Sequence, residues 1–397
     1  MIRPDNDSTT VTSIQSIQHI TVCGSINIDI YLSIDKLPHP GQTINTTSQN
    51  VVSRLGGKST NQAIAILRAS QLVSIESISH TLQLHAFAGD DAYGKQLHDQ
   101  LYSFKSHNTD SLASDSKYNI LFTPRIELLS SHCTGQAYIL HQSSGNNSII
   151  LVNGANYTGW HHQVTQHDTI MCVAESDVLL LACEIPLSVN LQLVQCLKQN
   201  QHKSCILDLG GNTTSLNNSH ELSQLLQIVD TIMPNESELF TLVDVESDTN
   251  NSTELYNNVY NAVQLIHSKY NSKVNVLVTL GEYGSIYFCG NVSNDQCGSI
   301  IQLIPPSHTT VNVIDTTGAG DCYRGCYTYH YYTQSKDIIQ SMIFATAAAE
   351  LSVQVSGAAE SMPHRNDIDA RITSTQYNIT QYSIIQYKQW LHHNNTT

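Results

Sequence analysis

The hydrophobic and polar residues of the first part of the chain follow the periods of strands and helices. Residues 19–34 form an extended apolar run that is broken at Gly24 and carries two polar residues, Asn27 and Asp29. Because successive side chains of a strand point to opposite faces, residues two apart share a face, so these two lie together. In residues 58–70 apolar residues recur at helical intervals after two glycines. The pattern predicts strand, loop, strand and helix in this order.

The middle and later parts of the chain show two further patterns. Residues 125–152 alternate in β fashion around a polar turn, which suggests a hairpin. After Asp177, short runs rich in Val, Ile and Leu alternate with helical stretches, as buried parallel strands do in βαβ units. We therefore predict an α/β fold, a doubly wound and mostly parallel sheet with helices on both faces. The β-rich pieces near residues 31–55 and 121–153 are expected to form a small separate β-sheet, a lid over one end of this body.

The predicted domain organisation is simple. One α/β domain is expected over residues 20–375, with an N-terminal extension at 1–19 and a polar C-terminal tail at 376–397 to which we assign no role. No internal repeat is apparent.

The negative net charge of the chain limits the kinds of molecule that it is expected to bind. The chain has 18 Lys and Arg against 33 Asp and Glu, a formal net charge of -15, which argues against non-specific binding to nucleic acid or to anionic membranes. It shows neither a signal-peptide pattern nor a run of 18 apolar residues. We expect small-molecule partners, neither nucleic acid nor membrane, and a cytoplasmic location with nuclear access left open. The ten cysteines include no Cys-x-x-Cys pair, and Cys322 and Cys326, four apart, are expected to be core residues.

The segment 313–327 carries the strongest chemical signal. A strand ends near Asp315, and a Gly-Ala-Gly turn (318–320) leads into a helix with Asp321 in its first turn. Glycines let successive N–H groups point into one concavity at the positive end of the helix dipole, where an anion binds well. A carboxylate beside a bound phosphate can accept a proton from an attacking hydroxyl. The alternative, a glycine turn with an aspartate cap, carries equal weight on this segment alone.

Two other segments are less specific. Residues 56–59 contain Gly-Lys-Ser, but Val52 stands where a P-loop needs glycine, so the sequence excludes a P-loop. Gly56 and Gly57 could instead admit a polyhydroxyl ligand to the backbone, with Lys58 and Asn61 donating to it; a surface lysine and an Asn cap remain open as the alternative. The adjacent acids at 90–91 are predicted to form a turn with a helix cap rather than a metal site.

Two segments after buried strands suit a nucleotide. Asn235, Glu236 and Glu238 follow a strand at the carboxyl edge, where α/β sheets collect ligands, and suit Mg²⁺ bound through water. Residues 278–285 supply a further strand followed by glycines, against which a flat base could lie. The sequence has no histidine cluster for zinc and no Gly-x-Ser-x-Gly elbow.

Taken together and in order, these motifs resemble the ribokinase family within the phosphofructokinase-B superfamily of carbohydrate kinases, from about Ile20 to about Pro363. Two of them look more like ribokinase than like adenosine kinase or phosphofructokinase, namely GSINID and PHPGQT. The seven motifs are GSINID (24–29), LPHPGQTI (37–44), GGKSTNQA (56–63), GDDAYG (89–94), PNESE (234–238), TLGEYG (279–284) and DTTGAGD (315–321).

The resemblance implies phosphorylation of the 5-hydroxyl of D-ribose by ATP, with Asp321 as the catalytic base and Gly318, Ala319 and Gly320 as the anion hole. A kinase of another sugar or of a nucleoside (deoxyribose, fructose, adenosine) is the alternative, and a non-catalytic sugar-binding homologue is a third. The resemblance further implies that the sugar hydroxyls are held by Asn27, Asp29, Gly57, Lys58, Asn61 and Glu184.

The same resemblance implies cofactors and a dimer. Asn235 and Glu238 would position Mg²⁺ and phosphates through water, and the ATP nucleotide would be bordered by Thr279, Gly281, Gly284, Gly320 and Thr346. A potassium-like cation would lie beside the anion hole, at the loop formed by Asp315, Thr317, Ser352, Val355, Gly357 and Ser361. Packing of two lids implies a homodimer.

The chain also departs from the family pattern. Ser59 and Thr60 replace the usual Gly-Ala beside the sugar site, and Thr346 stands where many relatives carry His or Asn near the adenine. Arg324 replaces the usual Asn three residues after the catalytic aspartate. We interpret Arg324 as a packing variation that could alter the charge near the site.

Overall fold

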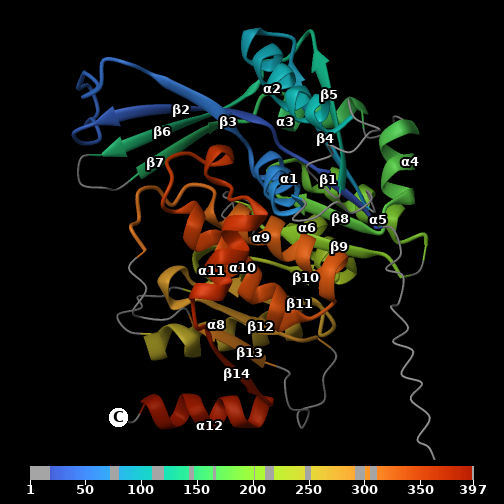
Figure 1. The fold of residues 1–397 in the computed structure, drawn as a ribbon, viewed down its shortest axis with the longest axis vertical. Helices are drawn as coiled ribbons and strands as arrows, with labels where there is room; N and C mark the ends of the chain where they lie inside the picture. The colour runs from blue at the N-terminus through green and yellow to red at the C-terminus, as the bar shows by residue number, and fades with distance from the viewer. Residues whose placement is uncertain are drawn as a thin grey trace, which may run out of the picture.

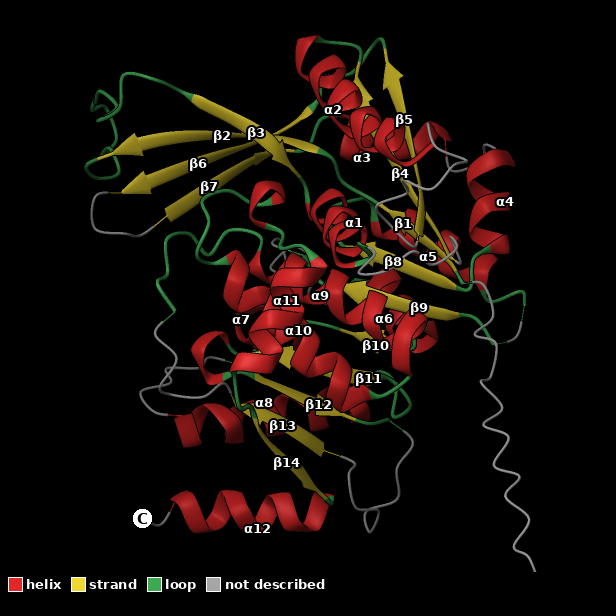
Figure 2. Cartoon of the chain, viewed as in Figure 1, coloured by secondary structure: helices red, strands yellow, loops and turns green. Residues whose placement is uncertain are grey.

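The computed structural model describes residues 18–71, 80–109, 120–142, 147–163, 167–200, 202–210, 219–245, 252–290, 300–304 and 311–395. Within these residues the strands form two sheets, which Figures 1 and 2 show as a large central layer between helices and a smaller sheet projecting at one end. The large sheet has ten strands in the order β14-β13-β12-β11-β10-β9-β8-β1-β4-β5, and the small one has four in the order β3-β2-β6-β7. This architecture confirms the predicted fold class.

The large sheet is parallel over most of its width. The parallel strands are β1 (His19–Cys23), β4 (His80–Gly89), β5 (Ile120–Leu129), β8 (Val178–Ala182), β9 (Ser204–Asp208), β10 (Thr231–Ile232) and β11 (Asn275–Thr279). At one edge the sheet continues antiparallel through β12 (Ser285–Phe288), β13 (Ile300–Ile304) and β14 (Asn378–Tyr382).

Helices cover both faces of this sheet because its strands are apolar on both sides. In β8, Leu180 joins one hydrophobic cluster while Leu179 and Leu181 join the other. The first cluster includes α1 (Lys58–Ala69), α2 (Ala92–Thr109), α9 (Ala319–Tyr329), the π-helical turn η3 (His330–Ser335), α10 (Ile338–Ser352), η4 (Ala359–Ser361) and α11 (Arg365–Ser374). The second includes α3 (Ala155–Gln163), α4 (His167–Glu175), α5 (Leu187–Leu197), α6 (His220–Ile228), α7 (Glu236–Val243), α8 (Ser252–Lys269) and α12 (Ile384–Asn395). Each hydrophobic cluster thus joins one face of the sheet to the helices that cover it.

The small sheet is the predicted lid. Its strands are β2 (Asn27–Ile34), β3 (Val52–Gly56), β6 (Gly135–Gln142) and β7 (Asn147–Val152). The predicted hairpin is confirmed by the antiparallel pairing of β6 with β7. The lid differs from the expectation in one part, since residues 120–129 form β5 and pair with β4 in the main sheet. An edge strand and a lid strand both bury alternate residues, so the sequence pattern does not separate them.

The C-terminal segment, to which we assigned no role, contributes structure to the domain. β14 adds to the edge of the main sheet by pairing with β13, and α12 packs on α8. The fully buried ring of Tyr387 stacks on Trp390, with ring centroids 5.5 Å apart. The second apolar cluster is therefore completed by residues beyond 375.

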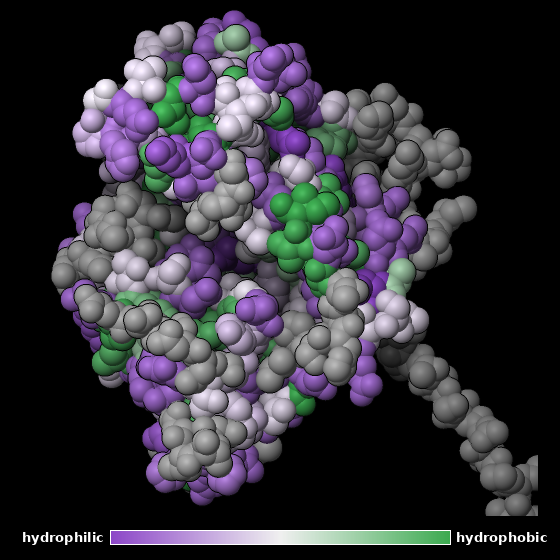
Figure 3. Space-filling view, turned by 90° about the vertical axis from the view of Figure 1, so that its left-hand side faces the viewer, coloured by the Kyte–Doolittle hydropathy of each residue, from purple (hydrophilic) through white to green (hydrophobic). Residues whose placement is uncertain are grey.

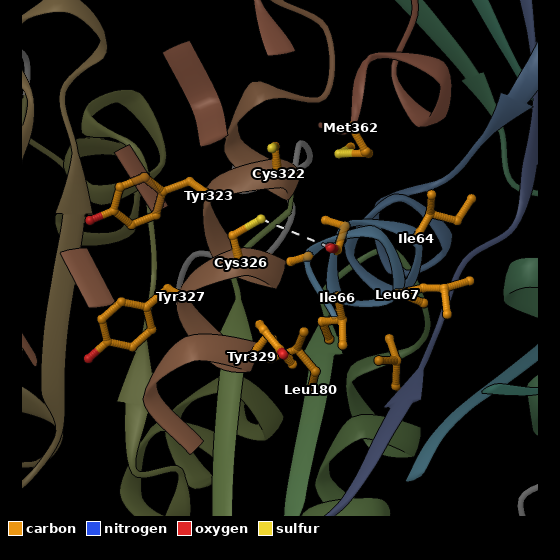
Figure 4. Packing of buried hydrophobic residues seen from close by; sticks show 14 of the residues in the cluster. Ile64, Ile66, Leu67, Leu180, Cys322, Tyr323, Cys326, Tyr327, Tyr329 and Met362 are labelled. Carbon is orange, nitrogen blue, oxygen red and sulfur yellow. Dashed lines mark hydrogen bonds between the residues drawn. The ribbon is translucent and has the colours of Figure 1, made fainter. Parts of the chain in front are cut away.

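Helices α1 and α9 pack against each other: the Cys326 thiol on α9 lies 4.0 Å from the Ala65 carbonyl oxygen on α1, the contact drawn as a dashed line in Figure 4. Gly325 makes this approach feasible, because a Cβ there would lie 2.6 Å from the carbonyl oxygen of Gln62. Cys322 and Cys326 are fully buried, which confirms their predicted core position, and all nine cysteines in the described part of the chain are free. The packing fixes the first turn of α9 against α1.

Candidate active site

Asp321 lies where the sequence places it, in the first turn of α9. The helix begins after Gly318, whose φ of 78° puts it in the left-handed region. A Cβ at Gly318 would lie 2.9 Å from both Cα and Cβ of Ala358, so only glycine fits this turn without strain. Ala319 and Gly320 form the start of the helix; the Ala319 N–H donates to the Thr316 carbonyl at 3.2 Å, whereas the N–H groups of Gly320 and Asp321 have no backbone partner in the described part of the chain. The turn is therefore suited to an anion.

Side chains of α1 hold the Asp321 carboxylate. The Asn61 amide donates to Oδ2 at 2.9 Å, and the Gln62 amide lies 3.4 Å from Oδ1. Asp321 is only 6 % exposed, and the carbonyl oxygens of both amide side chains are buried without a hydrogen-bond partner in the described structure. Hydrogen bonds from α1 therefore orient the Asp321 carboxylate. The Asn61 and Gln62 carbonyl oxygens beside it can each accept a hydrogen bond from a ligand hydroxyl.

The electrostatics of Asp321 suit a general base. Burial raises the pKa of its carboxyl, Lys58 opposes this rise and Asp208 adds to it, and the result is a pKa of about 6. Because this value lies below neutral pH, the carboxylate is charged there and yet is a stronger base than an exposed aspartate.

The predicted sugar residues meet where the lid joins the body. Ser25 donates to the Glu184 carboxylate at 2.5 Å, and the backbone N–H of Lys58 donates to the same oxygen at 3.1 Å. Asn27 starts β2, and its Oδ1 accepts from the Asn156 amide at 2.6 Å. Asn156 also bonds both backbone groups of Ile26, so it fixes this loop, although no sequence motif marked it.

Asp29 faces the same region from β2. It is 5 % exposed, and the glycine at position 56 makes room for it, since a Cβ there would lie 2.2 Å from the Asp29 carboxylate. Burial raises the pKa of Asp29 well above its usual value, and the carboxylates of Glu184 and Glu360 add to the rise. A buried carboxyl of this kind needs hydrogen-bond donors, which sugar hydroxyls supply.

A cavity of about 720 Å³ opens beside these residues. Ser25, Asn27 and Glu184 line it from the body, and residues 149–153, which include most of β7, line it from the lid. Figure 3 views the molecule from the side on which the lid projects, and shows a hollow lined by hydrophilic residues with a hydrophobic patch beside it. The cavity is large enough for a sugar and is lined by two of the predicted sugar residues, Asn27 and Glu184, while Asp321 is not part of its lining.

The side chain of Lys58 does not lie among the predicted sugar residues, where the resemblance placed it. The Lys58 ammonium lies 3.4 Å from Asp208 and 3.5 Å from Glu238, on the side of the predicted phosphate residues, while its backbone N–H serves the sugar side. Burial lowers the pKa of this ammonium, but the two carboxylates outweigh it and leave the pKa above the usual range. Ser59 and Thr60 turn their hydroxyls to the carbonyls of Cys23 and Ser25 at 3.4 and 3.0 Å. The hydroxyls that distinguish this chain from the usual Gly-Ala thus form hydrogen bonds with the protein backbone.

The predicted nucleotide residues lie along the carboxyl edge of the sheet. Asn235 caps α7 in a reciprocal capping box with Glu238, at 2.8 and 3.0 Å. Thr279 ends β11 and bridges to Asn235. The turn η2 (Gly281–Tyr283) follows, and Gly281 begins it and Gly284 comes directly after it, with φ of 55° and 89°. Thr346 is buried on α10. Because their side chains are engaged in the capping box, Asn235 and Glu238 fit a cation bound through water better than direct ligation.

The predicted cation loop is assembled by Asp315. Its carboxylate accepts from the N–H of Thr317 at 3.0 Å and from that of Gly357 at 2.9 Å, joining two distant segments. Burial raises the pKa of Asp315, but the hydrogen bonds from Gly357 and Thr317 keep it below the ordinary value. Ser352 ends α10, Val355 is exposed, and Ser361 ends η4. The structure thus brings Asp315, Thr317 and Gly357 together, and the cation at this loop stays a prediction.

Of two charged residues near Asp321, the sequence analysis missed Asp208 and interpreted Arg324 as packing. Asp208 is buried, and its Oδ2 accepts from Gln62 at 2.8 Å. Arg324, which we interpreted as a packing variation, is instead buried among carboxylates, 3.4 Å from Asp208 and 3.2 Å from Glu238. The position of Asp208 directly after a buried strand, at the carboxyl edge, was the signal that could have revealed it.

Comparisons with known proteins agree with this geometry. The family model for pfkB family carbohydrate kinases matches residues 108–365. A ribokinase of Arabidopsis thaliana is 32% identical over 349 residues, covering 88% of this chain and 79% of that protein, and one of Dictyostelium discoideum is 28% identical, covering 88% and 99%. The solved structure of Arabidopsis thaliana ribokinase complexed with ribose and ATP matches with a TM-score of 0.69 at 29% identity, covering 91% of this chain and all of that one.

Proposed function

Because the chain belongs to the pfkB family of carbohydrate kinases, we propose that it transfers the γ-phosphoryl group of ATP to the 5-hydroxyl of D-ribose. The products are ribose 5-phosphate and ADP. The observation that carries this proposal is the buried Asp321, held by Asn61 at the mouth of the Gly-Ala-Gly turn. The choice of ribose is supported by the ribokinases among the relatives.

In the proposed mechanism, Asp321 takes the proton from the sugar hydroxyl as that oxygen attacks the γ-phosphorus. The new bond joins the sugar oxygen to phosphorus, and the bond from phosphorus to the bridging oxygen of ADP breaks. The N–H groups of residues 318–320 stabilise the charge on the phosphoryl oxygens. Asn27, Asp29 and Glu184 orient the sugar, with Gly57 and the Lys58 N–H beside them. Mg²⁺, which Asn235 and Glu238 would hold through water, would neutralise phosphate charge when bound.

The lid has two proposed roles. It covers the sugar and excludes water, which would otherwise compete as phosphoryl acceptor. It also forms a homodimer contact, since it carries exposed apolar residues outside the cavity lining, Val51 and Val52 at 61 and 43 %. We expect light scattering to show a dimer that Val52→Asp converts to monomer, because a charge would be buried in the interface. A monomeric unchanged protein would contradict this role.

The cation loop predicts a dependence on monovalent ions. Asp315 ties Gly357 to Thr317, the residue before Gly318, so ordering of the loop by K⁺ would steady the anion hole. We expect turnover to fall when K⁺ is replaced by Li⁺ at constant ionic strength. Equal turnover in the two salts would refute the proposed cation site but not the proposed kinase activity.

The pKa of Asp321 predicts the acid limb of the pH profile. Since its carboxyl titrates at about 6, kcat/KM should be flat above that value and fall about tenfold per pH unit below it, as the base becomes protonated. Initial rates between pH 4.5 and 8, with stability checked at each pH, would measure this. A limb near pH 4 would show that Asp321 is not the group that titrates.

A panel of acceptors tests the substrate. Purified protein with MgATP would be offered ribose, deoxyribose, fructose and adenosine in a coupled assay of ADP release. We expect the highest kcat/KM with ribose. A preference for another acceptor would refute ribose as the substrate but not the kinase activity. No turnover with any acceptor would favour a non-catalytic sugar-binding protein.

A further inference from the structure

Arg324 lies at the centre of a buried group of charges on the phosphate side of Asp321. The side chain is 3 % exposed. Its Nε donates to the carbonyl of Met233 at 2.7 Å, at the end of β10, and lies 3.4 Å from Asp208. Its Nη2 donates to Glu238 at 3.2 Å. The guanidinium is therefore fixed from the ends of β9 and β10 and from α7.

The remaining nitrogen of Arg324 faces the anion hole. A Cβ at Gly320 would lie 2.6 Å from Nη1, so this nitrogen touches the turn from its side. Nη1 lies 4.0 Å from the Asp321 carboxylate, beyond hydrogen-bond distance, and it has no acceptor in the described part of the chain. Two of the three guanidinium nitrogens are thus held by protein, and the third borders the place proposed for the phosphoryl group.

The charges around Arg324 are nearly balanced. Two cations, Lys58 and Arg324, share three carboxylates, those of Asp208, Glu238 and Asp321. Asp208 contacts both cations and is itself 1 % exposed, so it shares the pairing of Lys58 and Arg324 with Glu238, which also contacts both.

We propose that Arg324, held in place by the carboxylates of Asp208 and Glu238, supplies positive charge and a free N–H to the γ-phosphoryl group at Gly320. This inference rests on the proposed function, because it takes the Gly-Ala-Gly turn as the phosphoryl site. It makes Arg324 part of nucleotide binding rather than of packing. Asp208 is a positioning residue, since it acts through the arginine.

A double-mutant cycle separates this role from a merely structural one. Arg324→Asn leaves Lys58 alone among three buried carboxylates, and Asp208→Asn removes the carboxylate that Lys58, Arg324 and Gln62 share, so each should lower Tm. The double variant removes both charges and should recover Tm. It should not recover turnover, which we expect to stay on the order of 10–10²-fold below the unchanged protein because the charge at the phosphoryl group is still missing. Recovery of both Tm and turnover in the double variant would overturn the proposal.

Calorimetry gives a readout that needs no turnover. The double variant should lose about tenfold or more in affinity for a non-hydrolysable ATP analogue and little for ADP, since only the former carries a γ-phosphate. Equal losses for the two nucleotides, or none, would overturn the proposal. The matched control is Arg365→Asn, which breaks an Arg–Asp pair on α11 at 2.8 Å and should change neither affinity. Failure of ribose as acceptor would leave these binding results unaffected, so the two proposals fail separately.

Discussion

Asp321→Asn is expected to lower kcat by roughly 10²–10⁴-fold while sugar binding stays close to that of the unchanged protein. The amide has the shape of the carboxylate, and its oxygen can still accept from Asn61, which now donates at 2.9 Å. It cannot take the proton of the attacking hydroxyl. Turnover would be measured by ADP release at saturating substrates, and sugar affinity by calorimetry.

The control for this variant is another aspartate outside the site. Asp90 is exposed and pairs with Lys95 at 2.9 Å, so Asp90→Asn should leave kcat unchanged. Asp321→Asn should also lack the acid limb near pH 6. Turnover near normal in Asp321→Asn would refute its assignment as the base.

Gly318→Ala is expected to reduce kcat by roughly 10²–10³-fold, the usual effect of losing an oxyanion-hole donor. Two costs coincide at this position. The left-handed backbone costs a non-glycine residue about 1–2 kcal/mol, and the new methyl would lie 2.9 Å from Ala358. Relief of this contact requires the turn to move, which displaces the N–H groups of Ala319 and Gly320. Steady-state kinetics and thermal unfolding would be measured on the same preparation.

Gly41→Ala is the matched control for this second prediction. Gly41 has a similar φ of 80°, but a Cβ there meets nothing within 4 Å. It should show the backbone cost in Tm and little loss of kcat. If Gly318→Ala behaves like Gly41→Ala, the turn does not hold the phosphoryl group as we propose.

The strands, helices and main motifs of this chain were predictable because each depends on local pattern. The turn before α9 is an example, since its glycines and the following Asp321 predict a helix N-terminus with an acid in the first turn. The lid hairpin was likewise visible in the alternation of β6 and β7.

Other features were hidden because they depend on contacts between distant segments. Arg324 and Asp208 are 116 positions apart in the chain, and nothing local to either shows that they lie 3.4 Å from each other. The edge strand β14 is largely exposed and polar, so it carries little apolar pattern. The hydroxyls of Ser59 and Thr60 donate to backbone carbonyls at the end of β1 and in the loop after it, contacts that sequence spacing does not indicate.

The most direct test is a crystal structure of the protein with ribose and a non-hydrolysable ATP analogue. Our account predicts the ribose 5-hydroxyl within about 3.2 Å of the Asp321 carboxylate, and the γ-phosphate against the N–H groups of residues 318–320. A complex in which that carboxylate points away from both reactants would contradict it.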